Sequence, residues 1–363
     1  MNSSSKRLPP EGPEDPENSP PNKFGGDLGM RQMPLIDTDV IATSTIASND
    51  NRAREEVPYR RSMEKWPTEC VLSNKPRVVF QNVPGTLPFS EELEPMLQHE
   101  LVRNRDPATS YDLLARRYLN FCWFTERLEI KAVIPICSRI ACSEAGFYVP
   151  PALASDCRRT IADEADHADR ASDQANEIMS ALGIAEVDKN EPAFWVSLQS
   201  STEGLDQRHK HLAQTIFTVV SETLISSTLS KVPADRRVNP FIRELVLDHA
   251  RDEARHAGIF SQVMERMWAE LSAKDKDLLG PRYAWCLAAF LEPDQTAQLR
   301  RLISVGFSDE HARRIIQETA EATDRATFRK AAAPTIGLMR RFGLLNHAAT
   351  FDALVQRDLL LEE

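Results

Sequence analysis

The chain has 363 residues, of which 42% are hydrophobic, and it carries a formal net charge of −10 with a pI near 5.4. This length and apolar content allow a folded domain with a sizeable core. The acidic balance argues against a nucleic-acid-binding surface, which is normally basic. The sequence has no apolar run long enough for a membrane span and no apolar signal core at its start, so we expect a cytoplasmic protein with no membrane partner.

The N-terminal part of the chain differs in composition from the rest. Six of the first 21 residues are proline, and no apolar periodicity persists up to residue 59. We therefore predict a disordered, proline-rich leader over residues 1–59. Residues 60–89 form a transitional arm in which Val78, Val79 and Phe80 are a candidate short strand or extended segment. Residues 90–363 are expected to form a single domain.

Helical signals dominate from residue 90 onward, and no strong β-alternation is present. Four long helices are predicted at 111–134, 155–182, 207–230 and 240–271. Pro135 should kink or end the first of them, and Gly183 should end the second. Shorter helices are predicted at 274–291, 294–305, 308–323, 326–342 and 347–360. The prediction is an all-α fold with a four-helix core and C-terminal helices packed on its outside.

The pattern Asp-Glu-x-x-His occurs twice, at residues 163–167 and 252–256, each time on a predicted long helix. A glutamate and a histidine three residues apart share one face of a helix. Two such helices facing each other can offer two carboxylates and two imidazoles to a pair of metal ions. These four candidate ligands are Glu164, His167, Glu253 and His256. The preceding Asp163 and Asp252 are candidate partners for the free N–H groups of the histidine rings.

A dimetal site of this kind needs one further carboxylate from each of the other two helices. Glu222 is the only carboxylate between residues 211 and 229, an otherwise strongly apolar helix. A buried carboxylate without compensation costs several kcal/mol or is neutralised, and a metal ion removes that cost. The first helix offers Glu126 and Glu129, and we favour Glu129 because it lies between Leu128 and Ile130.

A third histidine makes the two motif helices unequal. His249 precedes Glu253 by four residues and therefore shares its face of the helix, whereas the equivalent position of the first motif helix is Thr160. Four carboxylates balance the charge of two Fe²⁺ ions, and mixed carboxylate and imidazole ligation suits iron or manganese. The predicted ligand set is Glu129, Glu164, His167, Glu222, His249, Glu253 and His256.

This constellation resembles the diiron arylamine N-oxygenases of the p-aminobenzoate N-oxygenase (AurF-like) family. The resemblance runs from about residue 121 to residue 294 and includes DEARHAGIF at 252–260 and AFLEPD at 289–294. It implies a ferritin-like four-helix core, a ligand set of four glutamates and three histidines, and a homodimer. It also implies a monooxygenase that uses two iron ions and O₂ to oxidise an aromatic amine through hydroxylamine and nitroso stages towards nitro, in secondary metabolism such as antibiotic biosynthesis.

Two other functions share the paired motif. One is a diiron hydroxylase or desaturase acting on carbon, and the other is an iron-storage helical bundle. Small subunits of ribonucleotide reductase fit less well, because they keep a tyrosine about one turn after the first histidine, where this chain has Ala171. The sequence carries no flavin or nicotinamide fingerprint, so an oxygenase of this kind needs an external electron donor or electrons from its partly oxidised substrate.

Overall fold

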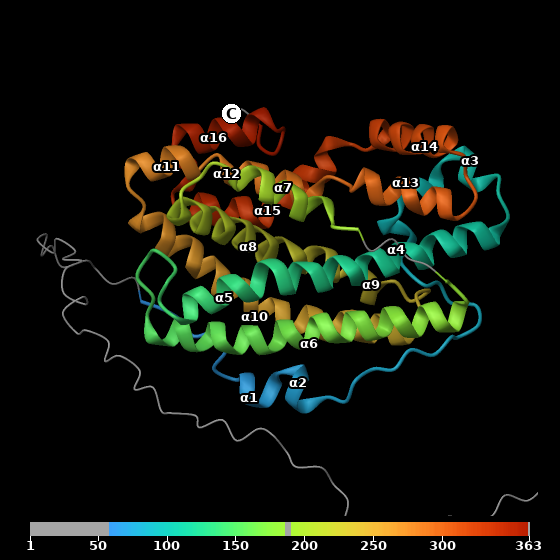
Figure 1. The fold of residues 1–363 in the computed structure, drawn as a ribbon, viewed down its shortest axis with the longest axis horizontal. Coiled ribbons are helices and arrows are strands. Elements are labelled where there is room, and N and C mark those ends of the chain that lie inside the picture. The colour runs from blue at the N-terminus through green and yellow to red at the C-terminus, as the bar shows by residue number, and fades with distance from the viewer. Residues whose placement is uncertain (1–57, 186–189, 362–363) are drawn as a thin grey trace, which may run out of the picture. The chain divides into compact units, whose positions relative to one another are not determined.

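The computed structural model describes residues 58–185 and 190–361, so the predicted leader lies, up to residue 57, outside the described residues. Helices dominate the described part of the chain, which contains no strand; its only β-type pairing is an isolated parallel bridge between Leu87 and Val238. The predicted all-α fold is therefore confirmed (Figure 1). Within these same ranges, no helix combines the length and the apolar character needed to cross a membrane.

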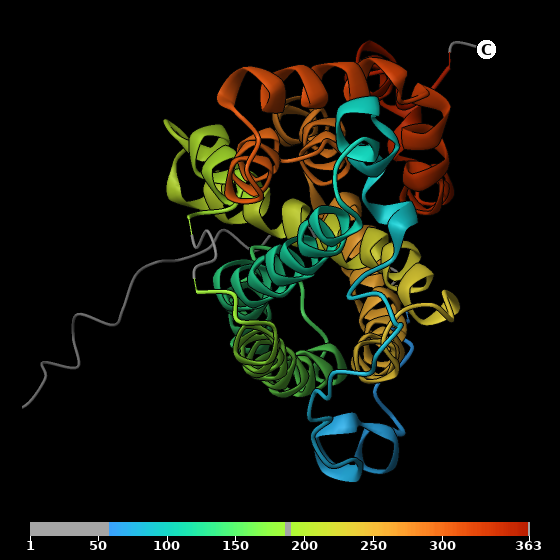
Figure 2. The same cartoon turned by 90° about the vertical axis from the view of Figure 1, so that its right-hand side faces the viewer.

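Four long helical segments form the core bundle. The first consists of α4 (Pro107–Leu128), a π-helical turn η4 (Glu129–Val133) and α5 (Ile134–Ala141). The others are α6 (Pro151–Leu182), α8 (Gln207–Leu229) and α10 (Pro240–Glu270). The first segment packs along α6, α10 packs along α8 and α6, and η4 and α5 also reach α8. Figure 2 views these helices nearly end-on.

Pro135 neither ends the first helix nor breaks it. A proline inside a helix removes one N–H donor, and its ring clashes with the carbonyl four residues earlier. Here the turn before it widens, and the Ile134 N–H donates to the Glu129 carbonyl five residues back. The widened turn begins at Glu129, one of the predicted ligands. Single π turns inside α-helices are frequent at functional sites.

The other helix boundaries follow local chemistry. Gly183 ends α6 with φ 66°, a left-handed conformation that glycine adopts without strain, as predicted. The single helix predicted at 274–291 is wrong, because Gly280 and Pro281 divide it into α11 (Ala273–Leu279) and α12 (Arg282–Leu291). A helix with no sequence prediction, α7 (Ala193–Thr202), packs on α8 and α12.

C-terminal helices cover α8 from the side opposite the other core helices. α12 and α15 pack on α8, and α13 packs on α4 (Figures 1 and 2). This enclosure explains why α8 is apolar over most of its surface. The bounds of the remaining elements are α9 (Lys231–Ala234), α13 (Gln295–Ser304), α14 (Asp309–Ala322), α15 (Arg325–Arg341), η5 (Leu344–Asn346) and α16 (Ala348–Gln356).

The arm before the bundle lies against α6 and α10. It contains two short helices, α1 (Trp66–Glu69) and α2 (Val71–Asn74), of which α2 packs on both long helices. Residues 78–80 have no regular secondary structure, so the strand alternative of the sequence prediction is wrong. Three further short elements, η2 (Glu91–Leu93), η3 (Pro95–Gln98) and α3 (Glu100–Arg103), lead into α4.

Apolar side chains form two separate clusters along the bundle. On α6 the first cluster extends to Cys157 and the second begins at Ala171. On α10 the second cluster extends to Val246 and the first begins again at Ile259. Both Asp-Glu-x-x-His motifs lie between these limits. The core therefore contains a polar layer between two apolar ones, and the candidate ligands occupy that layer.

Candidate metal centre

The seven predicted ligands converge in the polar layer of the bundle. The first core segment contributes Glu129 and α8 contributes Glu222, while α6 and α10 contribute the rest. None of the seven is more than 8% exposed. Burial of four carboxylates in one place is unfavourable unless cations compensate their charge.

The ligand atoms fall into two groups, within each of which they lie no more than 4.8 Å apart. One group contains His167, His249 and Glu253. The other contains Glu164, Glu222, Glu253 and His256. Glu253 belongs to both groups, so its carboxylate would be within reach of metal ions held by either group. The carboxylate of Glu129 lies on the side of the first group, 3.9 Å from Nε2 of His249.

The three imidazoles turn one nitrogen each towards the carboxylates. Nδ1 of His167 lies 2.9 Å from Oε2 of Glu164. Nδ1 of His256 lies 2.9 Å from Oε1 of the same glutamate. His249 uses the other ring nitrogen, Nε2, which lies 3.0 Å from Oε1 of Glu253. These are the nitrogen atoms that metal ions placed among the carboxylates would meet.

The two aspartates bind the histidines of the opposite motif helix. Nε2 of His167 lies 3.2 Å from Oδ2 of Asp252, and Nε2 of His256 lies 3.3 Å from Oδ2 of Asp163. Each aspartate thus accepts from the nitrogen that faces away from the carboxylate cluster. A carboxylate in this position fixes the tautomer and the orientation of a metal-binding imidazole. The sequence analysis predicted the type of contact but not that it crosses between helices.

Several buried polar atoms of the cluster have no hydrogen-bond partner in the part of the chain that the structure describes. They are Glu129 Oε1 and Oε2, Glu164 Oε1, Glu222 Oε2, Glu253 Oε2 and His256 Nδ1. The close approach of His256 to Glu164 therefore lacks hydrogen-bond geometry. Unpaired buried acceptors are costly, and native proteins leave few of them. Two divalent cations would meet these atoms, so the donor set fits a dinuclear metal centre.

The electrostatics of the cluster also favour cations. Burial raises the pKa of Glu129 and of Glu222 well above the ordinary value, and the charges of Glu164 and Glu253 raise it further. Burial lowers the pKa of His256, but the same two carboxylates outweigh it and raise the pKa well above its usual range. These shifts favour the protonated forms of Glu129, Glu222 and His256, and metal ions bound here would have to displace those protons.

The two glutamates that could supply the ligand of the first helix lie in different surroundings. Glu129 is 1% exposed and faces the cluster. Glu126 is half-buried and lines a groove between α4 and α6, together with Trp123 and Met179. On α6, the position equivalent to His249 is Thr160, whose hydroxyl donates to the carbonyl of Asp156 at 3.2 Å. The structure thus brings Glu129 to the cluster and leaves Glu126 outside it.

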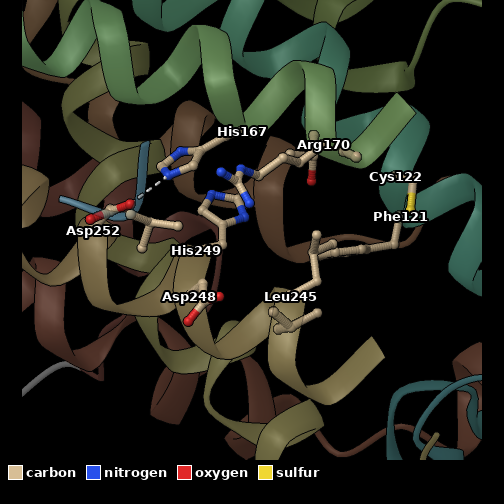
Figure 3. Close-up of a pocket in the computed structure, with 12 residues that line it drawn as sticks. Phe121, Cys122, His167, Arg170, Leu245, Asp248, His249 and Asp252 are labelled. Carbon is tan, nitrogen blue, oxygen red and sulfur yellow. Dashed lines mark hydrogen bonds and ion pairs between the residues drawn. The ribbon is translucent and has the colours of Figure 1, made fainter. Parts of the chain in front are cut away.

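A small cavity adjoins the cluster on the side of His167 and His249 (Figure 3). The rings of these histidines lie 4.2 Å apart, measured between centroids. The exposed wall of the cavity is mainly apolar, but the charged side chains of Arg170, Asp248 and Asp252 also line it. Nη1 of Arg170 has no hydrogen-bond partner among the described residues. The apolar lining comprises Val71, Phe121, Ala171, Leu245 and Val246.

Two residues that contact the aspartates were missed in the sequence analysis. Arg255 pairs with Asp252 from one helical turn further on, a spacing that is visible in the sequence. The indole Nε1 of Trp66 donates to Oδ1 of Asp163 at 2.8 Å. Trp66 lies 97 positions before Asp163 in a segment without periodicity, so no local pattern could have identified it.

Comparison with known proteins agrees with the resemblance noted in the sequence. The chain is 27% identical over 101 residues to a 4-aminobenzoate N-oxygenase of Streptomyces thioluteus. The aligned stretch is 28% of this chain and 30% of that protein, so it spans less than a third of the relative. The sequence model of the family described as P-aminobenzoate N-oxygenase AurF matches residues 74–343. Because this match covers most of the 363 residues, the chain belongs to the AurF family.

Proposed function

We propose that this protein is an O₂-dependent N-oxygenase that oxidises an aromatic amine at a pair of iron ions. Membership of the family supports the reaction class. The observation that carries the proposal is the convergence of four buried glutamates and three histidines, in which each glutamate and His256 leave at least one buried atom without a hydrogen-bond partner among the described residues. The proposed ligands are Glu129, Glu164, His167, Glu222, His249, Glu253 and His256.

Iron bound here would supply the redox chemistry that activates O₂. The chain's own contribution begins with charge, because four carboxylates balance two Fe²⁺ ions in a water-poor interior. Glu253 can contact both ions, since it belongs to both ligand groups. Asp163 and Asp252 hold the two motif histidines with their Nδ1 atoms towards the cluster. The apolar clusters on both sides of the polar layer exclude bulk water.

We further propose that the amine approaches through the cavity beside His167 and His249. Its mainly apolar walls suit an aromatic ring, and two of the proposed ligands bound it. The cavity has a volume of about 20 Å³, so it must widen to admit the ring. The Arg170 guanidinium can donate to a polar group of the substrate through the otherwise unpartnered Nη1. Electrons are expected from a separate donor or from the partly oxidised substrate.

The test is metal analysis and turnover with the full chain loaded anaerobically with Fe(II). The proposal predicts about two iron ions per chain, as in other dimetal carboxylate bundles, and air-dependent oxidation of 4-aminobenzoate at nitrogen. An aliphatic acid in place of the amine should give no product. Hydroxylation of the acid without N-oxidation would favour the carbon hydroxylase alternative. Uptake of many irons per chain would favour storage, and uptake of none would refute the proposal.

A further inference from the structure

We propose that Trp66 is a positioning residue for one of the two metal ions. Its indole fixes the carboxylate of Asp163, and that carboxylate in turn fixes the imidazole of His256. The inference rests on the metal centre of the proposed function, but it concerns a residue outside residues 74–343, the part of the chain that the family comparison covers.

The contacts form an unbroken chain from the arm to the cluster. Nε1 of Trp66 donates to Oδ1 of Asp163 at 2.8 Å, and Oδ2 of Asp163 lies 3.3 Å from Nε2 of His256. Nδ1 of His256 then faces Glu164 at 2.9 Å and Glu253 at 3.4 Å. Asp163 is 1% exposed, so no bulk water replaces a lost partner.

Among the residues that the structure describes, Oδ1 of Asp163 pairs with the Trp66 indole and Oδ2 pairs with His256. The indole N–H defines the rotation of the carboxylate about its Cβ–Cγ bond, and this rotation decides whether Oδ2 points at His256. Without the indole N–H, Oδ1 is left buried and unpaired, which costs free energy that rotation of the carboxylate can relieve. The imidazole then loses the contact that sets its orientation towards the metal.

The arm is attached firmly enough to hold Trp66 in place. The Tyr59 hydroxyl donates to Oδ2 of Asp156 at 2.9 Å, and Arg159 donates to the carbonyl of Met63 at 2.7 Å. Beyond Trp66, the ammonium group of Lys75 lies 2.7 Å from Oδ2 of Asp248 on α10. Trp66 is thus flanked on both sides by polar contacts between the arm and the two motif helices.

We expect the arm to influence the binding of only one of the two metal ions. Asp252, which holds His167, is paired with Arg255 of its own helix rather than with the arm. A change at Trp66 therefore acts on His256, and leaves the contacts of His167 with Asp252 and of His249 with Glu253 in place. A purely structural role of Trp66 would not distinguish between the two ions.

The test is anaerobic titration of the full chain with Fe(II) against a chromophoric chelator, which resolves the two binding steps. Trp66→Phe removes the N–H and retains an aromatic ring. It should weaken one of the two steps about tenfold, the lower end of effects at residues that support metal ligands, and leave the other step unchanged. Tyr59→Phe is the matched control, because it removes one hydrogen bond between the same arm and a buried aspartate of α6. It should change neither step.

Wild-type affinity for both ions in Trp66→Phe would overturn the inference, as would equal weakening of both ions. The same selective loss in Tyr59→Phe would also overturn it, because general loosening of the arm would then be sufficient. A wild-type chain that binds no Fe(II) would refute the proposed function itself, a result distinct from a normal titration of the Trp66 variant.

Discussion

The two helix pairs that meet at the candidate metal centre carry the same motif in different surroundings. α6 and α10 each present Asp-Glu-x-x-His, and the first core segment and α8 each add one buried glutamate. However, α10 adds His249, whereas α6 has Thr160, whose hydroxyl bonds to its own backbone. The repeated motif supplies two groups of candidate ligands, and residues outside the repeat make the two groups unequal.

The contacts that hold the candidate ligands also differ between the two motif helices. Asp252 is held from within α10 by Arg255, whereas Asp163 is held by Trp66 from the arm. Glu129 enters the cluster from a π turn, whereas Glu222 enters from a regular α-helix. We expect the protein to bind the two ions with different affinities for this reason. The following changes test that difference.

The largest effect is expected for Glu253→Ala. Glu253 belongs to both ligand groups. Its removal should therefore weaken the binding of both ions, so that the two sites no longer differ in affinity. We expect loss of more than about 100-fold in Fe(II) affinity at both sites, beyond the range found for supporting residues, together with loss of turnover. Metal analysis after gel filtration measures this. Retention of two tightly bound irons would remove Glu253 from the bridging position.

Glu129→Gln should affect one ion more than the other. The carboxylate of Glu129 lies near His249, on the side of the first ligand group. Replacing it with a neutral amide should weaken that ion by about 100-fold, at the upper end of the range for supporting residues. Glu126→Gln is the matched control, since Glu126 lines the groove outside the cluster. Equal loss in both variants would contradict the assignment.

His249→Thr makes the second motif helix resemble the first, which has Thr160 at this position. We expect the fold to persist and the ion beside His167 to bind about tenfold more weakly, because one imidazole ligand is lost. Circular dichroism reports the fold, and Fe(II) titration with the visible spectrum reports the site. An unchanged spectrum and unchanged affinity would show that His249 is not a ligand.

A change of pH should act similarly on the two ions, so it should have the smallest effect on the difference between them. Each half contains one glutamate and one histidine whose pKa is raised well above its ordinary value. The pairs are Glu129 with His167, and Glu222 with His256. Groups with a raised pKa hold protons that metal ions must displace. Lowering the pH should therefore weaken binding about tenfold per unit for each proton released.

Calorimetry of Fe(II) binding in buffers with different ionisation enthalpies counts the protons released. Similar release for the two ions would place their inequality outside these four groups, in His249 and the supporting contacts. Binding that is independent of pH, with no proton release, would contradict the raised pKa values of the cluster.

The sequence allowed prediction of the bundle and of the side chains that converge in it, because helical spacing is local information. Glutamate and histidine three or four residues apart must share a face, and a lone carboxylate such as Glu222 in an apolar helix requires a partner. The positions of these residues in the structure agree with that reasoning, while their role as metal ligands stays a prediction.

Other features depended on contacts that no local pattern contains. The indole of Trp66 reaches Asp163 across 97 positions, and the aspartates cross between helices only because α6 and α10 face each other. Pro135 predicts a kink or an end, and the helix does not end there but continues past it through one widened turn. Gly280 and Pro281, which divide the helix predicted at 274–291, are by contrast local signals that the sequence contains.

The most direct measurement is a crystal structure of the anaerobically iron-loaded chain, with anomalous scattering recorded at the iron edge. The account predicts two anomalous peaks in the polar layer, one beside His167 and His249 and one beside His256, with Glu253 between them. A map without iron in this layer, or with Glu129 and Glu222 turned away from the ions, would contradict it.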